Sequence, residues 1–291
     1  MKYGIILALL VLWGPTPELK AETGPWNFLM QLPARDSGIK LDRPVAIDVD
    51  SESRRYYVVD PVGGTLLSFD RDGKHLAAFN AGGALKQPVA LAKGRGGALW
   101  VIERSTNQVL RVNPSEQQVQ RFDLRYADGS LIFPARLAVD ERGRLLVLDR
   151  MRGTVVRLDD NLKVEMSFAA QPGGRGFVDF KIKSDGIWAL DGLAGKIYRF
   201  TDGAAPSVIT LNRAMEFPNS LEIDQGGQLY VLDRHAGTVM VFGAQGDFRH
   251  ELLGRGKRHG KLWYPAQLLF DWEGRLCVVD EGNSRVDIFN R

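Results

Sequence analysis

The sequence predicts an all-β chain closed into a six-bladed β-propeller, and three observations predict it. The 32 glycines are numerous, and many fall in short turn-like clusters, which favours many short strands over long helices. An apolar run that ends in an acid recurs six times, each copy flanked by two further apolar runs. The copies repeat every 41 to 47 residues, which is the period of a four-stranded propeller blade.

Each repeat opens with an apolar run that usually begins with proline. The six anchors are Pro44, Pro88, Pro134, Phe177, Pro218 and Pro265. The second run ends in the acid, and its six copies span 56–60, 99–103, 145–149, 187–191, 229–233 and 276–280. A third run follows, such as VVRLD or VMVF, and glycine-bearing turns such as ERGR, QGGQ and WEGR separate the runs. Each repeat therefore predicts an antiparallel meander of short strands.

The last repeat has only three apolar runs before the chain ends. The segment 26–44, WNFLMQLPARDSGIKLDRP, resembles the segment 246–265, GDFRHELLGRGKRHGKLWYP, which precedes the last repeat. Residues 27–33 are therefore predicted to form the outer strand of blade six. Pairing the two ends of the chain would close the ring and remove its open sheet edges.

The first 21 residues read as a secretory signal peptide, with one lysine followed by the short apolar run IILALLVLW. The alternative is an uncleaved membrane anchor. We expect cleavage after Ala21, one propeller domain over 22–291, no stable membrane span after processing, and a periplasmic or extracellular location. The single cysteine, Cys277, permits no internal disulfide and falls at a packing position, so we expect a buried, inert thiol.

The last repeat carries a family resemblance. Its VVDEGNSRVDIF resembles the NHL repeat, in which an apolar–apolar–Asp run precedes a polar loop with Asn, then Arg and an apolar strand. The best-matching stretch is 265–289, and the resemblance, to an exported bacterial type, covers nearly the whole chain after residue 21. The other repeats mostly replace Asn-x-Arg with GGT, RGT, AGK or AGT. The resemblance implies the propeller fold and leaves function open, because propellers serve as binding modules and as enzymes.

The innermost strands should alternate between apolar residues packed between blades and residues that face a central channel. The channel-facing set includes charged and polar side chains, namely Asp48, Arg136, Asp179, Lys181, Glu222 and Gln267. Two interpretations stay open. The side chains form a mutually neutralising network with water in the channel, or they form a site for a small ligand or a cation.

A metal enzyme is the alternative function that the channel suggests. Some six-bladed relatives are zinc-dependent lyases with histidines around the channel, but none of the four histidines here falls on an innermost strand. The stretch 217–233 is similar to calcium-dependent lactonases around Asn219. That similarity implies a calcium-assisted hydrolase with Asp48, Asp179, Asn219 and Glu222 as oxygen ligands. Otherwise we expect no cofactor and no catalytic residues.

The six acids that end the second runs recur at one structural position, which favours a structural role. A carboxylate there can accept backbone N–H groups from the adjoining loops. These acids are Asp60, Glu103, Asp149, Asp191, Asp233 and Asp280. Their recurrence does not indicate catalysis.

The loops of one face are rich in arginine and aromatic residues, a composition typical of recognition surfaces. The candidate binding residues are Arg104, Arg150, Arg152, Arg234, His235, Arg255, Lys257, Arg258, Trp263 and Tyr264. An ordinary solvated face is the alternative.

We expect this face to bind an envelope or extracellular protein, or another anionic partner. We expect no nucleic-acid partner, because the signal peptide indicates export. The sequence thus favours a non-catalytic protein-binding or scaffold module over the calcium-assisted enzyme.

Overall fold

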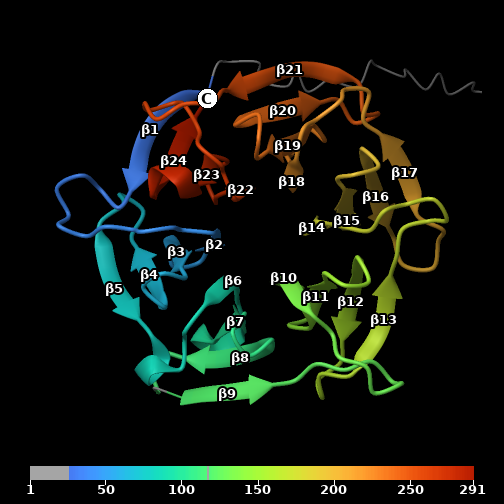
Figure 1. Cartoon of the computed structure of the whole chain (residues 1–291), viewed down its shortest axis with the longest axis horizontal. Helices are drawn as coiled ribbons and strands as arrows, with labels where there is room; N and C mark the ends of the chain where they lie inside the picture. Colours follow the sequence, from blue (N-terminus) through green and yellow to red (C-terminus); the bar gives the residue numbers. More distant parts are fainter. Residues whose placement is uncertain (1–25, 117) are drawn as a thin grey trace, which may run out of the picture.

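The structure, a computed structural model, describes residues 26–116 and 118–291 and confirms the six-bladed β-propeller (Figure 1). Six four-stranded antiparallel sheets follow one another around a central axis in chain order. The predicted signal peptide lies outside the described residues. Within the described ranges, no helix has the length and apolar character needed to cross a membrane.

Blades one to three are meanders that run outward from the channel. Blade one contains β2 (Ala46–Asp50), β3 (Arg55–Asp60), β4 (Thr65–Phe69) and β5 (His75–Phe79). Blade two contains β6 (Pro88–Lys93), β7 (Leu99–Glu103), β8 (Gln108–Asn113) and β9 (Gln118–Phe122). Blade three contains β10 (Pro134–Val139), β11 (Leu145–Asp149), β12 (Thr154–Leu158) and β13 (Val164–Phe168).

Blades four and five repeat this plan, and blade six draws on both ends of the chain. Blade four contains β14 (Asp179–Lys183), β15 (Gly186–Asp191), β16 (Lys196–Phe200) and β17 (Ser207–Thr210). Blade five contains β18 (Pro218–Ile223), β19 (Leu229–Asp233), β20 (Thr238–Phe242) and β21 (Phe248–Leu253). Blade six contains β22 (Gln267–Phe270), β23 (Leu276–Asp280), β24 (Arg285–Asn290) and β1 (Asn27–Leu32).

The alternating strand directions give the ring two distinct faces. We call the face made by the loops between the second and third strands, together with the loops between blades, the loop face. The opposite face consists of the turns between the first and second strands and between the third and fourth strands, and we call it the turn face. The three short 3-10 helices lie in these connections, namely η1 (Ala81–Gly83), η2 (Arg95–Gly97) and η3 (Glu281–Asn283).

The apolar residues of the described chain form one cluster between each pair of neighbouring blades. Alternation along each strand produces this arrangement, because successive side chains point to opposite faces of a blade and both faces of a blade pack against a neighbour. Cys277 is buried and free in the cluster between blades six and one, as expected from its position in the repeat.

Ring closure follows the prediction from the terminal segments. β1 pairs antiparallel with β24, and Leu32 lies opposite Val286. Both side chains are fully buried in the cluster between blades six and one. Just before β1, the Trp26 ring stacks on the Phe270 ring with centroids 5.9 Å apart. The two ends of the chain therefore complete one blade.

Each strand-end acid is buried, and in blades one to five it binds the backbone of two loops. Asp280 of blade six accepts the Trp263 N–H and the side-chain amide of Asn283. Asp233 accepts hydrogen bonds from the N–H groups of Glu216 and Phe217, at 2.6 and 3.1 Å, and from that of His235, at 3.1 Å. Glu103 does the same with residues 86, 87 and 105. The loop that enters each blade is thus tied to the loop between its second and third strands. These acids therefore have the structural role predicted for them.

Blade six buries an arginine between two carboxylates. The Arg285 guanidinium lies 3.1 Å from Asp280 Oδ2 and 2.9 Å from Asp287 Oδ1. Burial raises the pKa of Asp280 to about 6, against the opposing effects of its hydrogen bonds and of Arg285. Burial also raises the pKa of Asp287 to about 7, and the nearby charge of Asp280 adds to this shift.

Replacing Leu32 by Ala should lower the free energy of unfolding by about 2–4 kcal/mol, because it opens a cavity in the closing blade. Leu29 lies on the same strand and is exposed, so Leu29→Ala should change stability by about 0.5 kcal/mol or less. Deleting residues 22–35 should destabilise the ring further. Urea unfolding would measure the free energy of unfolding of all three variants. Equal stabilities for the two alanine variants would contradict closure through β1.

Asp287→Asn should change how stability depends on pH. A carboxyl whose folded pKa is raised stabilises the fold fully below its unfolded pKa, near 3.8, and loses that contribution as pH rises to about 7. The Asn variant lacks this loss. Its stability relative to the native protein should therefore increase as the pH rises from about 4 to about 7. Parallel stability curves from urea unfolding at several pH values would contradict the assignment.

Candidate functional site

The channel residues predicted from the sequence lie together and bind one another across blades. Asp179 Oδ2 accepts hydrogen bonds from Ser220 Oγ at 2.8 Å and from the Leu221 N–H at 2.9 Å. Its Oδ1 lies 3.6 Å from Arg136 Nε. Lys181 Nζ lies 3.9 Å from Asp179 and 3.8 Å from Glu222. These charges are therefore largely neutralised by one another.

Two further channel residues join neighbouring inner strands. Gln267 of β22 accepts a hydrogen bond from the Ile47 N–H at 3.0 Å, and Asp48 of β2 accepts one from the Lys93 N–H at 2.7 Å. Burial raises the pKa of Asp48 above its ordinary value, against the lowering effect of that hydrogen bond. The inner strands are thus connected by side chains where no sheet hydrogen bonds join them.

The four residues of the calcium hypothesis do not fit a calcium shell as they are arranged. Asp48 and Asp179 accept protein N–H or O–H donors, and Glu222 is paired with Lys181 and Lys183. Asn219 leaves one buried amide oxygen without a partner. Across residues 26–116 and 118–291, no group of three or more His, Cys, Asp and Glu side chains lies close enough to hold a metal ion. In this arrangement the three carboxylates are already engaged by protein donors or cations.

Three guanidiniums gather where the channel opens on the loop face. Arg104 and Arg150 follow the strand-end acids of blades two and three, and Arg136 lies on the inner strand of blade three. Burial and the charges of Arg150 and Arg136 lower the pKa of Arg104. Within the described chain, neither Arg104 nor Arg150 has an ion pair with an acid, and Arg150 lies 5.5 Å from the centroid of the Phe133 ring. This part of the loop face therefore has uncompensated positive charge.

Blades five and six form a platform of stacked rings on the same face. The His235 ring stacks on the Phe217 ring with centroids 4.7 Å apart, and the Tyr264 ring meets His235 edge-on at 6.1 Å. Arg234 donates to the Tyr264 carbonyl at 2.9 Å and to Glu281 Oε2 at 2.8 Å, which fixes its guanidinium beside the rings. Phe217 and Tyr264 are exposed, so the platform is accessible to a partner.

The basic loop 254–265 extends this platform and is held by the NHL-like motif. Arg255 lies 4.6 Å from the Trp263 ring centroid, and Lys257 lies 5.9 Å from it. Arg285 donates to the carbonyl oxygens of residues 257, 258 and 261, and Asn283 donates to that of residue 256. Asn-x-Arg in the last repeat therefore positions the most basic loop of the chain.

Arg152 and Arg258 complete the predicted binding set but do not share these contacts. Arg152 lies 3.7 Å from the Tyr126 ring centroid and donates to Ser130 Oγ at 2.7 Å, so it closes its own loop in blade three. The Arg258 side chain is exposed, while its carbonyl oxygen is bound by Arg285.

Exposed apolar side chains on the loop face were missed by sequence reasoning. Val62, Met151 and Leu193 are 59%, 69% and 80% exposed, more than any other large hydrophobic residue of the described chain. Each stands two residues after a strand-end acid, at the tip of the loop between the second and third strands. Aligning the six loops on that acid would have revealed them, because the tip position is polar or glycine in the other repeats.

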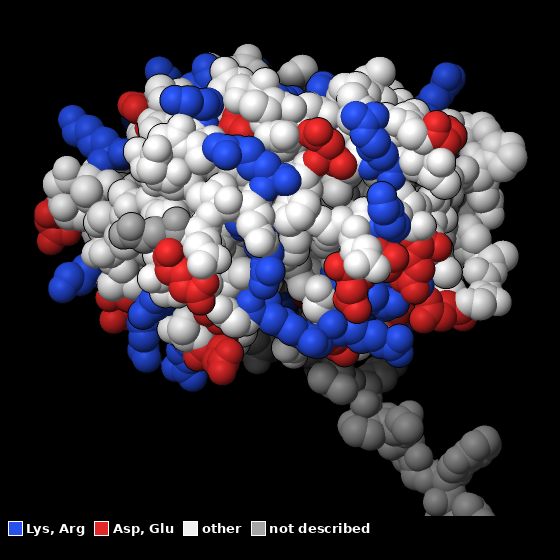
Figure 2. All heavy atoms as spheres, turned by 90° about the horizontal axis from the view of Figure 1, so that it is seen from below, with Lys and Arg blue, Asp and Glu red and all other residues white. Residues whose placement is uncertain are grey.

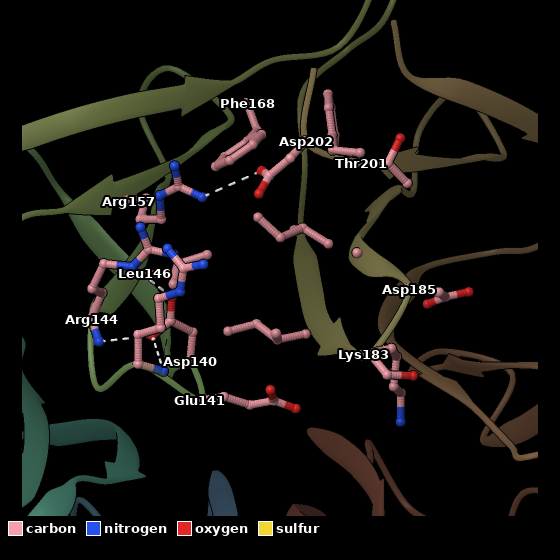
Figure 3. Close-up of a pocket in the computed structure, with 16 residues that line it drawn as sticks. Asp140, Glu141, Arg144, Leu146, Arg157, Phe168, Lys183, Asp185, Thr201 and Asp202 are labelled. Carbon is pink, nitrogen blue, oxygen red and sulfur yellow. Dashed lines mark hydrogen bonds and ion pairs between the residues drawn. The ribbon is translucent and has the colours of Figure 1, made fainter. Parts of the chain in front are cut away.

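A cavity on the turn face was also missed. It has a volume of about 420 Å³ and lies between blades three and four, with Leu146 and Phe168 on its apolar side and Arg157 and Asp202 across its opening (Figure 3). Its lining comes from turns and strand ends of blades three and four, and no sequence pattern indicates that these segments enclose a cavity. An edge-on view from the side of β9 shows Lys and Arg spread over this side of the ring, with Asp and Glu among them (Figure 2).

Sequence comparison does not assign the chain to a family. No protein-family model matches it, and no curated protein matches it. The NHL resemblance of the last repeat therefore stays a prediction.

Solved structures share the fold. A streptogramin B lyase superposes with a TM-score of 0.67 at 12% identity, over 89% of this chain and 96% of that chain. A virginiamycin B lyase from Staphylococcus aureus gives 0.63 at 13% identity, over 87% and 98%. A gluconolactonase from Xanthomonas campestris gives 0.64 at 18% identity, over 86% of each chain. At these identities the likeness shows the six-bladed propeller alone.

Proposed function

We propose that this protein is a non-catalytic propeller that binds a protein partner through its loop face. One observation carries the proposal, namely the three apolar tips at Val62, Met151 and Leu193. A partner that covered these side chains would remove apolar surface from water, which is favourable. They recur on blades one, three and four, so a partner could contact several blades at once.

The platform on blades five and six supports the same proposal. Arginine and aromatic side chains are enriched among the residues that dominate binding free energy. Here Arg234 and Arg255 are held against Tyr264 and Trp263, so little side-chain entropy would be lost when a partner docks. The platform would supply a rigid, aromatic and basic half of the interface.

The partner we propose combines acidic groups with apolar surface. The acids would face Arg104 and Arg150, which have no acidic partner of their own, and apolar side chains would cover the tips. An envelope or extracellular protein fits this chemistry, and the location follows from the proposed signal peptide. The likeness to lyases and a gluconolactonase, at 12% and 18% identity, is a likeness of fold and carries no argument about activity.

Reversing Arg150, Arg234 and Arg258 to Glu should abolish capture of the partner, because it replaces attraction to acidic groups with repulsion. Capture from an envelope extract onto immobilised protein would measure this. The matched control reverses Arg71, Arg121 and Arg249, which are exposed away from the loop face, and should leave capture unchanged.

A photo-crosslinking residue placed at Leu193 would then identify what touches the loop face. The same residue at Leu76 on the outer strand β5 serves as the control. A protein crosslinked only from Leu193 supports the proposal. Undiminished capture by the loop-face variant, or equal crosslinking from both positions, would contradict it.

Adding calcium should leave the melting temperature unchanged, because the channel carboxylates are already paired with cations or hydrogen-bond donors. Thermal unfolding with calcium, compared with a chelator, measures this directly. A calcium-dependent rise in melting temperature that Glu222→Gln removes would instead favour the calcium-assisted enzyme.

A further inference from the structure

The turn-face cavity has the size and lining of a small-molecule site. Its volume of about 420 Å³ falls within the range of roughly 300–1,000 Å³ that such sites occupy. Leu146, Phe168, Ile187 and Phe200 supply its apolar side and belong to the cluster between blades three and four. The cavity lies on the opposite face from the proposed partner surface, so it is independent of that proposal.

Arg157 is the group in this cavity that a ligand could engage. It lies on β12, its side chain is buried, and its Nε donates to Glu165 Oε2 at 2.8 Å. The other side of its guanidinium, at Nη1, has a looser ion pair, 3.7 Å from Asp202 Oδ1. Figure 3 shows this contact between the two blades, with Phe168 beside it.

Asp202 is a weak partner for a buried arginine. Its side chain is 85% exposed, and an ion pair with a solvated carboxylate contributes little. Two other cations of the lining are better satisfied, since Arg144 bonds Asp140 at 2.8 Å and Lys183 pairs with Glu222. The remaining one, Arg142, is exposed to solvent. A ligand that has both a carboxylate and an apolar part could therefore replace Asp202 on Arg157, while its apolar part filled the apolar side of the cavity.

We propose that this cavity binds a small amphipathic carboxylate, with its apolar body against Leu146, Phe168 and Ile187 and its carboxylate on Arg157 in place of Asp202. The Asp202 carboxylate then competes with the ligand's carboxylate for Arg157. The ligand class is defined by these two contacts: an aromatic or branched aliphatic body, and one anionic group at its end.

Calorimetric titration with 4-phenylbutyrate tests the proposal, with the neutral 4-phenylbutanol as the matched ligand. The carboxylate should bind in the millimolar range or tighter, and the alcohol about tenfold more weakly. Asp202→Asn should strengthen carboxylate binding by about three- to tenfold, because it removes the competing charge. Asp72→Asn is the control, since Asp72 occupies the corresponding turn of blade one and is 77% exposed, and it should change nothing.

Arg157→Gln should abolish carboxylate binding and leave the weak alcohol binding in place. If that variant does not fold, the Asp202→Asn result decides alone, because Asp202 is solvated and its change should not disturb the fold. Equal binding of acid and alcohol, no effect of Asp202→Asn, or no binding of the acid at all would each overturn the proposal.

Discussion

The buried carboxylate at the end of each second strand is the interaction on which this propeller depends. In five blades it accepts backbone N–H groups from the loop that enters the blade and from the loop that follows it, and in blade six the Asn283 side chain takes the place of the second loop's backbone. A hydrogen bond to a charged group contributes about 1.5–3 kcal/mol, and a buried carboxylate left without donors would be costly. The loop face is therefore fixed by one buried carboxylate in each blade, and its side chains can vary without loss of the fold.

This constraint separates the scaffold from the surfaces that it presents. In blades two, three and five the residue after the acid is an arginine, namely Arg104, Arg150 and Arg234. In blades one, three and four the next residue, at the tip of the loop, is apolar. Blade six differs, because its Asn283 and Arg285 turn inward and hold the basic loop of the preceding connection. On the turn face, aspartates such as Asp140 and Asp159 accept N–H groups within a single turn. The cavity there arises where an arginine on a third strand meets a loosely held acid on the next blade.

The parts of the molecule that repeat could be predicted, and the parts that occur once could not. Blade number, strand positions, ring closure through residues 27–33 and the role of the strand-end acids follow from period and alternation, which the sequence displays directly. The alternation of the inner strands also groups the charged channel residues, but it leaves open whether they bind a ligand. The stacking of Phe217 on His235, the apolar tips and the turn-face cavity depend on loop conformation, or on contacts between repeats that no local pattern encodes.

Closure through β1 has a consequence for how the chain is made. β1 pairs with β24, so a nascent polypeptide carries β1 unpaired until β24 has been made. Contacts between such distant residues form late and slowly, and open strand edges are prone to mispairing in the meantime. The blade that closes the ring is therefore the last to be completed, and the edge of the unfinished ring is exposed for as long as β24 is absent.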